Sequence, residues 1–99
     1  YERYREAHGL SPEIAEGLYP GDYLVPLGRA LKDRPGDRFL DRPESEWLVP
    51  IRDFAIDAMM AMIRDDLAAL GVEMDVYSSE RALYGTGKIE LAIDRLRSL

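Results

Sequence analysis

The chain has no cysteine and a single histidine, His8. Disulfide bonds and thiolate metal sites are therefore excluded, and no second histidine can join His8 as a neutral nitrogen ligand. We expect no metal site and no catalytic residue in this chain. His8 is expected to be a solvated residue at the end of a helix, where the partial negative charge of the helix C-terminus favours it.

The chain also lacks an excess of basic residues and any long apolar run. Lys and Arg total 13 against 19 Asp and Glu, for a formal net charge of −6. A nucleic-acid-binding surface is normally strongly basic, so this chain is a poor candidate for the main contact surface with nucleic acid. No apolar run approaches the roughly 20 residues of a membrane span, and no signal peptide is recognisable. With the absence of cysteine, these features favour a cytoplasmic protein without a membrane partner.

What the chain does contain is a composition typical of a globular protein. Of its 99 residues, 46% are hydrophobic and 32% are charged. This length predicts a single unit over residues 1–99 with a small core and modest stability. The chain opens at Tyr1 inside a helical stretch and without an initiator Met, so we expect an excised fragment of a longer protein.

The first third of the sequence predicts three short helices. Residues 1–8 read as the end of a helix closed by a glycine. A Ser-Pro pair can open a second helix over residues 11–17. Asp22 is the predicted N-cap of a third helix over residues 23–33. A turn follows over residues 34–37.

A long central helix is predicted over residues 51–70, and it can also begin earlier, at a capping box formed by Asp41 and Glu44. Its apolar residues form two stripes, so we expect it to be contacted from two sides, with the other helices packed around it. A last helix is predicted over residues 87–99, with Thr86 as N-cap. Its inward-facing residues would be Ile89, Ile93 and Leu96.

Residues 72–77 alternate between apolar and polar side chains, which is typical of a half-buried strand. A single strand cannot satisfy its own backbone groups, so we expect its partners in another part of the full protein or in a second copy of the chain. The strand would deliver Glu80 to its end, where a rigidly held carboxylate can present an anion to a cationic ligand. On residue type alone, the plainer interpretation of Glu80 is a surface residue.

Three segments, in this order, carry a resemblance to a known family. The first is E-G-L-Y-P-G-D-Y-L, with Tyr19, Gly21 and Tyr23 at the positions of a Tyr-x-Gly-x-Tyr element. The second is the helical run over residues 55–72. The third is D-V-Y-S-S-E, which ends at Glu80. Together they resemble the middle of the catalytic domain of class I arginyl-tRNA synthetases of bacterial type.

The resemblance implies that the parent protein is an arginine–tRNA ligase, which uses ATP with magnesium to attach arginine to its tRNA. It implies that the carboxylate of Glu80 contacts the guanidinium of the substrate arginine. It also implies a fold that is mainly α: a small helical fragment with a long central helix and one short extended segment, cut from a Rossmann-type catalytic domain.

The HIGH-like and KMSKS-like ATP motifs of that family are not found in this sequence. The fragment is therefore not expected to be active or to hold a cofactor by itself, and it is expected to self-associate through core surface that excision exposes. The rival hypothesis is a free-standing, acidic, helical interaction module without catalysis, which would use the wide face of the central helix.

Overall fold

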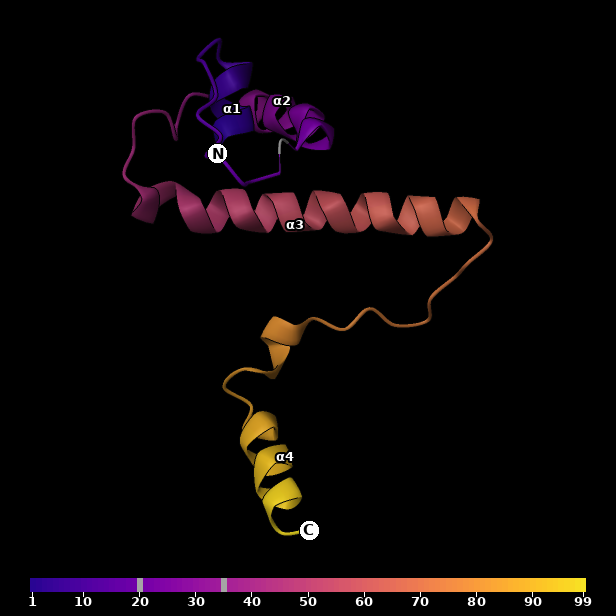
Figure 1. The fold of residues 1–99 in the computed structure, drawn as a ribbon. Helices are drawn as coiled ribbons and strands as arrows, with labels where there is room; N and C mark the ends of the chain where they lie inside the picture. The colour runs from indigo at the N-terminus through magenta and orange to yellow at the C-terminus, as the bar shows by residue number, and fades with distance from the viewer. Residues whose placement is uncertain (20, 35) are drawn as a thin grey trace.

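The computed structural model describes residues 1–19, 21–34 and 36–99, and these residues form a mainly α-helical structure without a β-strand (Figure 1). The helices are α1 (Glu2–Ala7), α2 (Val25–Asp33), α3 (Glu44–Ala69) and α4 (Lys88–Arg97), with short 3-10 helices η1 (Asp22–Leu24) and η2 (Glu80–Leu83). The prediction of a mainly α fold with a long central helix is confirmed. The predicted turn over residues 34–37 includes Pro35, which lies outside the described residues.

Helices α1 and α2 approach each other at Gly28. A Cβ added at Gly28 would lie well inside van der Waals contact with the backbone carbonyl of Arg3. Glycine is thus required here by the closeness of two backbones rather than by its own conformation. Leu31 of α2 is buried in the same region.

The core is a small cluster of four buried side chains contributed by α1, α2, α3 and the loop between α2 and α3. Its centre is Tyr4, whose hydroxyl donates to the carbonyl of Gly36 at 2.5 Å and accepts from the amide of Phe39 at 3.3 Å. Burial raises the pKa of Tyr4 above its ordinary value. At the edge of the cluster, Tyr1 stacks on Trp47 with ring centroids 4.0 Å apart. The buried side chains of this cluster are Tyr4, Leu31, Phe39 and Ile51.

Beyond this core the chain is extended. Its radius of gyration is 18.1 Å, whereas a compact chain of this length has about 13 Å. Its accessible surface is 8115 Å², against about 5,700 Å² for a compact monomer of the same mass. Helix α4 lies apart from the other helices (Figure 1), so the prediction that all helices pack around α3 is wrong. Ile89 is half-buried, but Ile93 and Leu96 are exposed instead of facing inward.

Two predicted elements are absent from the residues that the structure describes. Residues 11–17 form no helix. The segment is instead held to α1 by a hydrogen bond of 2.8 Å from the Glu13 amide to the Glu2 carboxylate, and a helix this short is marginal without packing. Residues 72–77 form no strand and contain a bend at Asp75, because the described chain offers no strand to pair with them.

Three helix starts also differ from the sequence predictions. Helix α3 runs without interruption through Pro50, and its N-cap is Pro43; Asp41 adopts a left-handed conformation (φ 54°) that is incompatible with a capping box. Helix α2 follows the 3-10 turn η1, which includes Asp22. Helix α4 begins after Gly87, so Thr86 precedes the cap by one residue, and its hydroxyl accepts from the Lys88 amide at 3.3 Å.

No helix in the described parts of the chain combines the length and apolar character that crossing a membrane requires.

We predict that Gly28→Ala destabilises the chain. By helix propensity alone the change should stabilise α2 by up to about 1 kcal/mol. The clash with the Arg3 backbone reverses this sign, and overpacking of this kind costs about 1–3 kcal/mol. Thermal or urea unfolding followed by circular dichroism measures the effect. Arg29→Ala, at the exposed neighbouring position, is the matched control and should not destabilise. A Gly28→Ala chain as stable as the control would contradict the close packing of α1 and α2.

Candidate functional site

Glu80 lines an open cleft of about 600 Å³ between α3 and residues 77–81. The helix side of the cleft contains side chains at positions 53, 56, 57, 60 and 64, a spacing that places them along one face of an α-helix. The opposite side is the D-V-Y-S-S-E segment and the residue after it. The lining residues are Asp53, Ile56, Asp57, Met60, Arg64, Tyr77, Ser78, Ser79, Glu80 and Arg81.

Two charged contacts cross this cleft. The Arg81 Nη1 donates to the Asp53 Oδ1 at 3.0 Å. The Arg64 guanidinium lies 4.6 Å from the centroid of the Tyr77 ring, within range of a cation–π interaction. The hydrogen bond from Arg81 holds the pKa of Asp53 below its ordinary value, and the charges of Arg81 and Arg52 act in the same direction.

The remaining carboxylates of the cleft can receive a cation. Both arginines of the lining have a partner within the cleft, whereas Asp57 and Glu80 make no ion pair with any described residue. A guanidinium is a planar fork of donors that pairs with a carboxylate through two parallel hydrogen bonds. The arrangement suits a cationic ligand with an apolar stem, which can lie against Ile56 and Met60.

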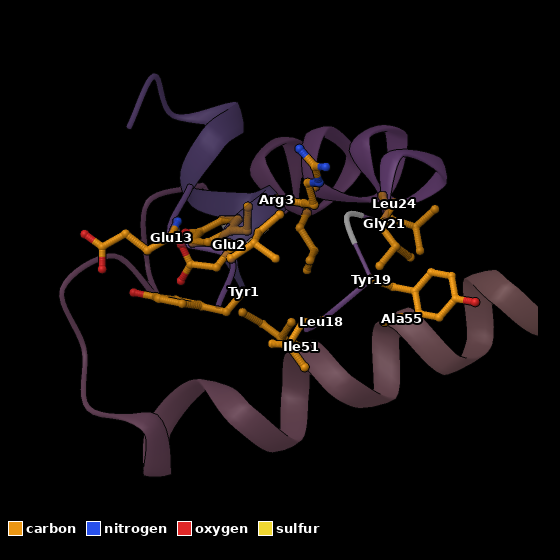
Figure 2. Close-up of a pocket in the computed structure, with 15 residues that line it drawn as sticks. Tyr1, Glu2, Arg3, Glu13, Leu18, Tyr19, Gly21, Leu24, Ile51 and Ala55 are labelled. Carbon is orange, nitrogen blue, oxygen red and sulfur yellow. Dashed lines mark hydrogen bonds between the residues drawn. The ribbon is translucent and has the colours of Figure 1, made fainter. Parts of the chain in front are cut away.

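The Tyr-x-Gly-x-Tyr element lies outside the cleft that Glu80 lines. Tyr19 and Gly21 line a second, mainly apolar pocket of about 240 Å³ among α1, α2 and α3, which Figure 2 shows. Gly21 is buried in a left-handed conformation (φ 64°), which favours glycine. Tyr23 does not line this pocket and is 51% exposed. The structure therefore does not bring this element together with Glu80.

His8 is not the solvated residue that the sequence predicted. It is half-buried, its ring meets the Tyr4 ring edge-on with centroids 4.7 Å apart, and its Nε2 lies 3.2 Å from the carbonyl oxygen of Gly36. Its place against the core accounts for its burial. Within residues 1–19, 21–34 and 36–99, no group of three or more His, Cys, Asp or Glu side chains is placed to hold a metal ion.

Comparison with known proteins identifies the family. Over all 99 residues the chain is 70% identical to an arginine–tRNA ligase of Cereibacter sphaeroides. It is 70% identical over 97 residues, or 98% of the chain, to that of Paracoccus denitrificans, and 61% identical over 98 residues, or 99% of the chain, to that of Ruegeria pomeroyi. The chain is homologous to a segment of the arginine–tRNA ligases. It spans 17% of the length of each of these relatives.

The resemblance to arginyl-tRNA synthetases is thereby confirmed, and a free-standing interaction module is not favoured. No protein-family model matches the chain, and no solved structure matches it.

We predict that Arg81→Gln returns the pKa of Asp53 toward its ordinary value of 3.8. In the unchanged chain the pKa is lower, so the pair stabilises the fold at pH values above about 4, and this contribution is lost as the pH falls through the lowered pKa. A carbon-13 NMR titration of the Asp53 carboxyl measures both values. Arg97→Gln, in the exposed α4, is the control and should leave the titration unchanged. Identical titrations of Asp53 with and without Arg81 would contradict the pair.

Proposed function

We propose that this chain is part of an arginine–tRNA ligase, an enzyme that attaches arginine to its tRNA with ATP. The relatives that match the chain over 97–100% of its length bear this name, which supports the proposal. In this reading residues 1–99 form one unit within a Rossmann-type catalytic domain, and the parent acts in the cytoplasm, where bacterial proteins are made. Its partners are arginine, ATP and tRNA.

The contribution of this chain is one side of the arginine-binding site. The carboxylate of Glu80 binds the substrate guanidinium, and Asp57 adds negative charge to the same cleft. The observation that supports this role is the placement of these two carboxylates, without ion-pair partners among the described residues, in a cleft of about 600 Å³. Lysine, which presents a compact point charge, cannot reproduce the paired hydrogen bonds of a guanidinium, so such a site favours arginine.

Activation of the arginine carboxylate belongs to other parts of the parent. The described residues offer no cluster suited to magnesium, so we assign no step of the ATP chemistry to this chain. The residues of the cleft bind and orient the side chain of the amino acid, which places its carboxylate for the reaction.

The test is Glu80→Gln in the full-length ligase. Glutamine keeps the shape of the side chain but removes its charge, and a hydrogen bond to a charged group contributes about 1.5–3 kcal/mol. We therefore expect the KM for arginine to rise about tenfold or more, while the KM for ATP stays nearly unchanged. Steady-state ATP–pyrophosphate exchange at varied arginine and ATP measures both constants.

Glu73→Gln is the matched control, because Glu73 is exposed and does not line the cleft. An arginine KM that is the same for Glu80→Gln and for Glu73→Gln would show that Glu80 is a surface residue without a role in binding.

We further propose that the 99-residue chain self-associates through the exposed apolar side chains of α3. Ile56 is 45% exposed, Ile63 43% and Leu70 79%, and contiguous apolar surface promotes association. Sedimentation of the chain at several concentrations should give an average mass that rises with concentration. Ile63→Glu should lower this association, whereas Asp66→Glu on the same helix should not. A chain that stays monomeric at millimolar concentration would contradict the proposal.

A further inference from the structure

We propose that Asp53 and Arg81 are positioning residues for Glu80, whose role in arginine binding is the proposed function above. Arg81 directly follows Glu80 in the chain, and its guanidinium is bonded to the Asp53 carboxylate of α3 at 3.0 Å. The pair therefore fixes the peptide that carries Glu80 against the helix that forms the other side of the cleft.

The segment before Arg81 has few other ties to α3. The amide of Val72 bonds to the carbonyl of Leu67, but from residue 73 to residue 84 no backbone hydrogen bond to α3 is present among the described residues. Residues 71–80 are all exposed. The polar contacts that cross from this segment to α3 are those of Arg81 with Asp53 and of Tyr77 with Arg64.

The two contacts fix both the direction and the register of the segment. Asp53 and Arg64 are eleven residues apart, which is about 16 Å along the helix axis. Arg81 meets the earlier of these two residues and Tyr77 the later one, so the segment returns antiparallel to α3, as the path of the chain in Figure 1 shows. Glu80 lies between the two contacts in the sequence and is adjacent to Arg81.

The solvent exposure of Asp53 and Arg81 determines how strongly loss of their ion pair should affect arginine binding. The side chains of Asp53 and Arg81 are 49% and 56% exposed. Exposed ion pairs are weak and are screened by salt. Loss of the pair should therefore disturb Glu80 by a small factor, well below the effect of removing the charge of Glu80 itself.

The experiment uses the full-length ligase with Asp53→Asn, Arg81→Gln and the charge-exchanged double variant Asp53→Arg/Arg81→Asp. Each single variant should raise the KM for arginine about two- to fivefold, with kcat and the KM for ATP nearly unchanged. The double variant should restore most of the loss, which a general structural defect would not allow. Asp66→Asn, on α3 but outside the cleft, is the control and should behave as the parent does.

Hydrogen exchange of peptides that cover residues 77–84 gives a readout that is independent of substrate. Exchange should accelerate about two- to fivefold in the single variants and slow again in the double variant. Unchanged exchange and unchanged arginine KM in Asp53→Asn would overturn the proposal. A lower arginine KM in Arg81→Gln would overturn it as well, because Arg81 would then compete with the substrate for Asp53.

The two proposals fail in different ways. If Glu80→Gln leaves the arginine KM unchanged while Asp53→Asn accelerates hydrogen exchange, the positioning role of the Asp53–Arg81 pair is supported and the binding role of Glu80 is overturned. If Glu80→Gln raises the arginine KM while neither Asp53→Asn nor Arg81→Gln changes KM or exchange, Glu80 keeps its role and the positioning pair is overturned. If the single variants raise the arginine KM and the double variant does not restore it, the positioning role of Asp53 and Arg81 is also overturned.

Discussion

The hydroxyl of Tyr4 is the contact on which the rest of the structure depends. It donates to Gly36 and accepts from Phe39, and so it joins α1 to the loop that leads into α3. Tyr4 is 1% exposed, so without its hydroxyl the Phe39 amide would lose its partner near the core, at a cost of about 1–3 kcal/mol, whereas the Gly36 carbonyl would keep the His8 ring at 3.2 Å. With four buried side chains in the core cluster of the described residues, little other free energy holds α3 against α1 and α2.

Helix α3 carries two different tasks along its 26 residues, which span about 39 Å. Its first half is packed: Ile51 is buried in the core, and Phe54 lies against it. From Asp53 onward, another face forms the wall of the cleft, and exposed apolar residues such as Ile63 lie beside it, since Ile63 is two turns after the cleft residue Ile56. The packing near Ile51 therefore sets the position of the cleft, because a continuous helix transmits its orientation from one end to the other.

Helical periodicity was sufficient to predict α2, α3 and α4, because each carries apolar residues at helical spacing over nine residues or more. Sequence patterns failed where the secondary structure of a segment depends on contacts with other segments. Residues 11–17 have capping residues but almost no buried side chain, and residues 72–77 have strand alternation but no strand beside them. The motif singled out Glu80, which the structure places in the lining of a cleft. Its neighbours Asp53 and Arg64 were missed, although their spacing on one face of α3 was the available signal, because charged residues on a helix face are usually solvated.

The weakness of the contacts around Glu80 has a consequence for the proposed ligase. The pair of Asp53 and Arg81 is about half exposed in this chain, so water and salt screen it strongly. Any further part of a ligase that packs on the exposed apolar face of α3 removes water from the same helix. The effective dielectric constant around the pair then falls, and the attraction between the two charges rises. The same loss of water costs desolvation of both charges, so the parent must leave the pair partly solvated for the contact between Asp53 and Arg81 to become stronger. Under that condition, folding of the larger domain and ordering of its arginine-binding carboxylate would be coupled through one helix.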